Sequence, residues 1–139
     1  ILAITGAGGA FGQILKALPI QASIQGLSTT GLGIFVPFII ACIFKLSMGA
    51  STVAMITTAS IMVPLMETMG FASPLGRVLV VMAIGAGSMV ASHANDSYFW
   101  VVSQFSDMKT EEAYKAQTGM TAAMGITIIL ILFVVSLFV

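Results

Sequence analysis

The composition of this 139-residue chain is that of a protein that lies in lipid. Hydrophobic residues make up 58% of it and charged residues only 7%, and five basic side chains balance five acidic ones. About a quarter of the residues in an ordinary globular domain are charged. So few charges cannot cover a water-facing surface, and there is no basic patch for phosphates. These numbers exclude a soluble enzyme domain, a disordered tail and a nucleic-acid-binding module, and they favour an integral membrane protein.

The first segment, residues 1–25, contains a glycine cluster followed by a short apolar run. Its spacing fits neither a dinucleotide-binding turn nor a P-loop, because Phe11 stands where a third glycine is needed and Gln13 where a P-loop has lysine. Glycine-rich helix starts expose backbone N–H groups and a positive dipole end. The cluster therefore predicts an anion-binding turn and no nucleotide cofactor. The residues expected to contact the ligand are Gly6, Gly8 and Gly9.

Residues 31–69 form an apolar stretch that is too long for one ordinary membrane crossing. Small polar residues interrupt it near its middle, which predicts two half-length helices, roughly 34–46 and 52–68, that meet at a break. A broken helix persists in a membrane only where protein or a wet cavity surrounds the break. The alternative is that the small residues only let helices pack closely, but two breaks in one short chain favour a binding site. The ligand-binding residues predicted at this break are Gly49, Ser51 and Thr52.

Residues 76–105 predict a transmembrane helix that carries ionisable groups. His93 and Asp96 are three residues apart, on one face of such a helix, and Asn95 lies between them. Ionisable residues inside a membrane are costly and by default mark ion or proton pathways. The alternative is a helix end at the headgroup level, with residues 98–100 as an aromatic belt. We favour the first interpretation, in which His93, Asn95 and Asp96 couple a proton to transport.

The remaining segments predict a connector and a final span. Residues 106–118 form a polar loop with a short helix capped by Asp107 or Thr110, and residues 119–139 form an apolar, charge-free transmembrane helix. Lys45 is expected to extend from its apolar stretch toward the membrane surface, although its place just before Gly49 also allows a ligand contact.

Three phrases of the sequence, in this order, resemble the gluconate permease family. They are ITGAGGAFG at residues 4–12, GASTVA at residues 49–54 and SHANDSYFW at residues 92–100. The third phrase is the most specific, and the resemblance covers essentially the whole chain. It implies a C-terminal portion of a multi-pass transporter of the bacterial inner membrane, which carries gluconate or a related sugar acid or hydroxy acid together with protons.

The resemblance also implies a fold. The family is similar to the wider ion-transporter superfamily, in which inverted repeats each supply a re-entrant hairpin and a broken transmembrane helix around a central site. The expected fold is therefore an all-α integral membrane protein, the C-terminal half of such an inverted-repeat transporter. Its expected partners are a small organic anion, protons, the lipid bilayer and a second copy in a homodimer, with no nucleic acid, metal or cofactor.

Three other functions remain open from the sequence. A sodium-coupled organic-anion transporter would use the unwound carbonyl groups to hold Na⁺. A membrane-embedded enzyme would need a nucleophile or a metal beside His93, yet Cys42 lies in an apolar run and the chain has a single histidine. An accessory membrane subunit would use the breaks only for packing. We expect a transporter rather than an enzyme, without catalytic residues.

Overall fold

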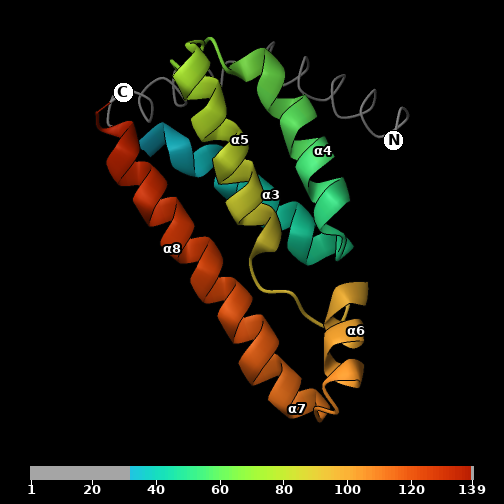
Figure 1. The fold of residues 1–139 in the computed structure, drawn as a ribbon. Helices are drawn as coiled ribbons and strands as arrows, with labels where there is room; N and C mark the ends of the chain where they lie inside the picture. Colours follow the sequence, from blue (N-terminus) through green and yellow to red (C-terminus); the bar gives the residue numbers. More distant parts are fainter. Residues whose placement is uncertain (1–31, 139) are drawn as a thin grey trace.

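The computed structural model describes residues 32–138, and every regular element in this part of the chain is a helix (Figure 1). The all-helical architecture agrees with the all-α fold class that the family resemblance implies. The expected hairpin arm at residues 1–25, with its three glycines Gly6, Gly8 and Gly9, lies outside the described residues.

The first two long helices are separated by a two-residue break. A 3₁₀ turn, η1 (Leu32–Ile34), leads into α3 (Phe35–Met48), and α4 (Ser51–Met62) follows and continues as a second 3₁₀ turn, η2 (Val63–Leu65). Helix α3 ends because Gly49 takes a left-handed conformation with φ +71°, which glycine adopts without steric cost. Ala50 is extended, with φ −105° and ψ 111°, and turns the chain into α4.

Residues 76–105 were expected to form one helix and instead form two. The N-cap of helix α5 (Pro74–Met89) is Ser73, whose Oγ accepts a hydrogen bond of 3.0 Å from the Gly76 N–H. It stops because Val90 is extended and Ala91 has φ +51°. Helix α6 (Ser97–Phe105) begins only after this second break. The sequence shows the polar groups of the break but no proline or glycine that would end α5 there.

The C-terminal part is more helical than expected. Helix α7 (Thr110–Ala113), a π-helical stretch η3 (Tyr114–Thr118) and α8 (Gly119–Ser136) join into one helix of 27 residues. Residues 110–118 of the expected loop are thus helical. The N-cap of this helix is Lys109 rather than Asp107 or Thr110, and the Lys109 N–H donates to Glu112 Oε2 at 2.9 Å. Among the described helices only this one is long and apolar enough to cross a membrane.

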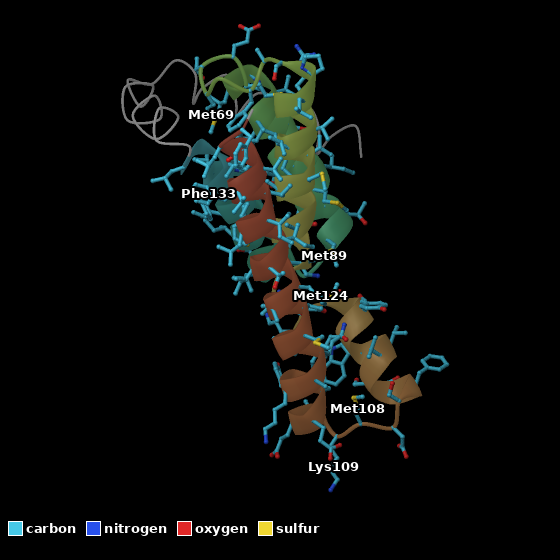
Figure 2. The ribbon with its side chains drawn as sticks, turned by 60° about the vertical axis from the view of Figure 1, so that its left-hand side comes forward. Met69, Met89, Met108, Lys109, Met124 and Phe133 are labelled. Atoms are coloured by element: carbon cyan, nitrogen blue, oxygen red, sulfur yellow. The ribbon has the colours of Figure 1, made fainter. Side chains whose placement is uncertain are left out.

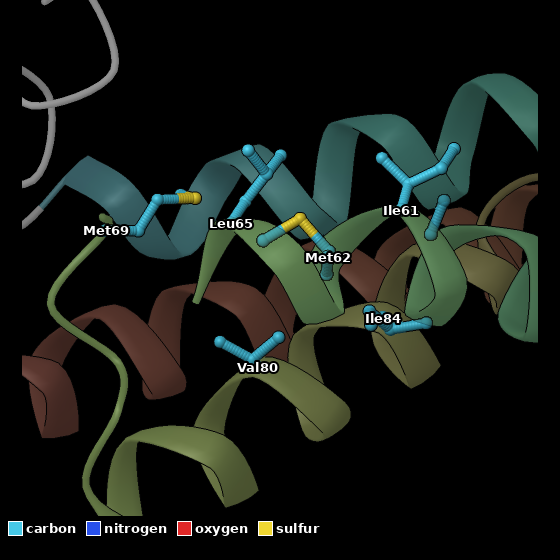
Figure 3. Packing of buried hydrophobic residues seen from close by; sticks show 7 residues of the cluster. Ile61, Met62, Leu65, Met69, Val80 and Ile84 are labelled. Atoms are coloured by element: carbon cyan, nitrogen blue, oxygen red, sulfur yellow. The ribbon is translucent and has the colours of Figure 1, made fainter. Parts of the chain in front are cut away.

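Helices α3, α4, α5 and α8 pack together, with α5 in contact with the other three (Figure 1). Figure 3 shows most of the buried cluster to which α4 contributes Met62 and α5 contributes Val80 and Ile84; Ala41 of α3 belongs to the same cluster. A second cluster fills the space between η1, α5 and α8. Gly87 lets α5 approach α3 closely, because a Cβ atom there would lie 2.8 Å from the Ala41 Cβ.

The outward faces of the packed helices are apolar. Large hydrophobic side chains such as Ile43, Val81 and Ile131 are more than half exposed, although they stand on regular helices. Such a surface suits lipid contact and agrees with the composition. Figure 2 shows that α6 and the first half of the α7–α8 helix project beyond the other helices, with Met108 and Lys109 at the far end.

Candidate functional site

The two breaks line one partly open cavity of about 330 Å³. One wall comes from the α3–α4 break and the other from the break before α6, although the two are more than forty residues apart in sequence. Its lining therefore combines two of the segments that the sequence analysis singled out. The lining residues are Met48, Gly49, Ala50, Ser51, Thr52, Asn95, Asp96, Ser97 and Tyr98.

Two helices begin at this cavity. Ser51 is the first residue of α4 and Ser97 the first residue of α6, and both line it. The first N–H groups of a helix have no partner inside the helix, and its dipole is positive at that end. Helix α4 has no side-chain cap at its start, so its first N–H groups are left for another acceptor. The uncapped start of α4 therefore makes its wall of the cavity favourable for an anion, whereas the Asp96 carboxylate already caps the start of α6.

Lys45 lies directly behind the cavity wall and is 1% exposed. Its Nζ atom donates to Gly49 O at 3.0 Å and Ser51 Oγ at 3.0 Å, and it contacts Asp96 Oδ2 at 2.5 Å. The expectation that Lys45 extends toward the membrane surface is therefore wrong. A buried ammonium group is held only where anionic and polar partners compensate for its lost hydration, and here three residues of the cavity wall provide them.

Asp96 links the two breaks and starts α6. Its Oδ2 atom accepts from Lys45 and, at 2.6 Å, from Ser92 Oγ, while Oδ1 accepts from the Tyr98 N–H at 3.0 Å. The last bond is an N-cap, which explains why α6 starts where it does. The pair Lys45–Asp96 is the one salt bridge of residues 32–138, and its two ends come from opposite walls of the cavity.

Asn95 holds the second break against the end of α3. Its Nδ2 atom donates to Leu46 O at 2.9 Å and lies 3.5 Å from Ser47 O. On the other side, the Asn95 carbonyl group occupies the space beside Gly49, where a Cβ atom would overlap it. Asn95 thereby satisfies carbonyl groups that the last turn of α3 leaves without a helical partner.

The long C-terminal helix supports the second break from the other side. The Ser92 N–H donates to Thr121 Oγ1 at 3.0 Å, and Thr118 Oγ1 donates to Ser92 O at 2.5 Å. The π-helical stretch ends at Thr118, and such stretches are frequent at functional sites because they redirect neighbouring side chains. The two threonines supply the hydrogen bonds that Ser92 lacks outside a helix.

His93 lies beside the cavity rather than in its wall. The side chain is half-buried, and its Nδ1 atom is 3.0 Å from Ala91 O. The expected helical face shared by His93 and Asp96 does not form, because both residues precede α6 in non-helical backbone.

The structure therefore brings together Gly49, Ser51 and Thr52 with Asn95 and Asp96, which the sequence analysis placed in two separate roles. The sequence analysis assigned no role in the site to Ser92, Tyr98, Thr118 and Thr121, and it gave Lys45 only a possible contact. A signal for Lys45 was present, since its spacing of four residues from Gly49 puts its side chain beside the last turn of α3. In the part of the chain that the structure describes, no three His, Cys, Asp or Glu side chains come together as metal ligands.

Comparison with known proteins shows the family to which the chain belongs. The family model described as GntP family permease matches residues 1–138. The chain is 34% identical to a gluconate permease of Pseudomonas aeruginosa over 99% of its own length and 30% of that protein. It is 33% identical to a gluconate permease of Bacillus licheniformis, over 96% of the chain and 31% of that protein. An inner membrane permease of Escherichia coli is 33% identical over 91% of the chain and 28% of that protein.

The chain thus spans about a third or less of the length of these relatives. No solved structure matches it. The family match covers all three sequence phrases and confirms the resemblance that they carry. The chain belongs to the GntP family of permeases.

Proposed function

We propose that this chain forms part of a proton-coupled transporter that imports gluconate or a related sugar acid across the bacterial inner membrane. The observation that carries the proposal is the cavity at which α4 and α6 both begin, with the buried Lys45 behind it. The Pseudomonas aeruginosa relative is named a gluconate permease, and the Escherichia coli relative is named an inner membrane permease.

The cavity has the groups that a sugar acid needs. Backbone N–H groups at the uncapped start of α4 suit the carboxylate, and the hydroxyl groups of Ser51 and Thr52 suit either the carboxylate or the substrate hydroxyls. Gly49 keeps this wall free of a side chain. We propose that a second group of backbone donors for the substrate comes from Gly6, Gly8 and Gly9.

Asp96 is the proposed proton acceptor, since it is the carboxylate of the cavity wall among the described residues. His93 is proposed to pass protons toward it, because it lies three residues away and the two nitrogens of an imidazole ring can donate and accept protons. Asn95 is proposed to hold the carboxylate in place by fixing the break to α3.

Sodium coupling is the alternative, and the backbone contacts weigh against it. Na⁺ at a broken helix is coordinated by free carbonyl groups. Here Gly49 O already accepts a hydrogen bond from Lys45, and Leu46 O accepts one from Asn95. A cation coordinated by these two oxygens would share them with both donors and would lie close to the positive charge of Lys45.

The test is uptake of radiolabelled gluconate by the full-length protein in liposomes with an imposed pH gradient and no sodium. Unlabelled glycerate and a dicarboxylate are added as competitors in parallel. Accumulation of gluconate that competes with glycerate supports the proposal. Uptake that requires sodium, or an absence of uptake with every substrate, contradicts it.

A further inference from the structure

The Lys45–Asp96 pair joins the two walls of the cavity, and its charges cancel while Asp96 is ionised. In that state the cavity offers an anion the uncapped start of α4 but no net positive charge from side chains. Protonation of Asp96 changes this, because the ammonium group of Lys45 then has no counterion within the described residues. The cavity gains one positive charge, which a carboxylate can neutralise.

We propose that Lys45 exchanges its counterion between Asp96 and the substrate carboxylate, and that this exchange couples the anion to the proton. The inference rests on the proposed function and adds to it the residue that links the two bound species. Each state that it allows has a neutral ion pair: Lys45 with Asp96 in the empty site, or Lys45 with the substrate in the loaded one.

The geometry gives Lys45 a route to the substrate. Its Nζ atom donates to Ser51 Oγ, which lines the cavity. Because this hydroxyl accepts from Lys45, its own hydrogen is free to donate to a bound anion. The Ser51 hydroxyl thus carries the influence of the buried ammonium group to the cavity surface, and Lys45 need not leave its position.

The surroundings of Asp96 leave this role to Lys45. Ser92 and the Tyr98 N–H, the other groups bonded to its carboxylate, are uncharged, and His93 bonds to a backbone oxygen outside the cavity wall. From α4 only the uncharged Ser51 and Thr52 reach the cavity. Asp96 is the only charged side chain of residues 32–138 that lines the cavity.

Thermodynamic linkage makes the exchange quantitative. Whatever factor protonation of Asp96 adds to the affinity for the anion, the bound anion adds to the affinity of Asp96 for a proton. One unit charge a few ångströms from a carboxylate in a partly buried site is sufficient for a factor of about ten or more. The loaded state with an ionised Asp96 would hold two carboxylates for one ammonium group and is disfavoured.

The test measures binding of radiolabelled gluconate to the full-length protein in detergent at low and at high pH. Wild type is expected to bind at least about tenfold tighter at low pH. Asp96→Asn, which imitates the protonated acid, should bind equally at both pH values and as tightly as wild type at low pH. Adding Lys45→Met to Asp96→Asn should remove that gain, and Lys109→Gln, an exposed charge far from the cavity, should behave as wild type.

The double variant removes both charges, so it leaves no unpaired ion buried and separates the role of Lys45 from a failure to fold. Equal binding by Asp96→Asn with and without Lys45→Met overturns the inference, as does a pH dependence that survives Asp96→Asn. If either result is found while the wild type still binds gluconate, the proposed function stands and only the inference about Lys45 fails. Wild-type protein that binds no sugar acid at either pH contradicts both.

Discussion

The Asn95 carbonyl group fills the space that a side chain at Gly49 would need. A Cβ atom at Gly49 would overlap the Asn95 oxygen and lie 2.6 Å from its carbonyl carbon, and Gly49 also has φ +71°. This close approach joins two breaks that are far apart in the sequence and sets the width of the cavity between them.

Gly49→Ala is therefore expected to damage both breaks. Backbone strain and overlap together should cost about 2 kcal/mol or more, and the forced separation should abolish uptake. Gly85→Ala is the matched control, because a Cβ atom there meets nothing within 4 Å. Thermal stability in detergent and gluconate uptake check the pair. Equal behaviour of the two variants would show that the contact with Asn95 does not shape the site.

Removal of the hydroxyl groups at the start of α4 should weaken substrate binding without unfolding the protein. Ser51→Ala is expected to raise the KM for gluconate about tenfold, since a hydrogen bond to a charged group contributes about 1.5–3 kcal/mol. Thr52→Val should also raise the KM for gluconate, by a smaller factor. Ser60→Ala is the control, because the Ser60 hydroxyl bonds to Ile56 O within its own helix. An unchanged KM in Ser51→Ala would remove this hydroxyl from the site.

The support that the C-terminal helix gives to the second break can be tested at Thr121. Thr121→Val leaves the Ser92 N–H without its acceptor, at an expected cost of about 1–3 kcal/mol, and Thr121→Ser should restore stability. Thr127→Val should change stability by less than about 0.5 kcal/mol, since Thr127 is exposed and bonds to Ala123 O. Comparable losses in Thr121→Val and Thr127→Val would contradict a specific role for the contact with Ser92.

His93→Gln and Asp96→Asn should have different consequences. Because His93 lies outside the cavity wall, His93→Gln is expected to slow proton-driven uptake of gluconate. The uptake that remains should still depend on pH. Asp96→Asn should abolish that dependence. The two variants are compared by the pH profile of uptake. The reverse result would move the proton site from Asp96 to His93.

The sequence predicted the break between α3 and α4 but not the break before α6. A glycine followed by small hydroxyl residues in a long apolar stretch indicates a helix end, and Gly49 marks that end with its positive φ. The break at Ala91 has no such residue, and the apolar periodicity runs up to it without a stop signal, so one helix was expected in place of two.

The ion pair was out of reach for a different reason. Lys45 and Asp96 are 51 positions apart, and only tertiary packing of α3 against α5 brings them together. Local pattern gave Lys45 the ordinary behaviour of a lysine in an apolar segment, which is to extend toward water. The structure buries it because Asp96, Ser51 and Gly49 offer it three partners at once.

The proposal that Asp96 accepts the proton that enters with the sugar acid can be tested directly. The most direct measurement places the full-length protein in liposomes with a pH-sensitive dye inside and adds gluconate outside, without sodium. Wild type should acidify the interior, and Asp96→Asn should exchange gluconate without acidification. Acidification that persists in Asp96→Asn, or gluconate entry in wild type without any change of internal pH, would contradict the account.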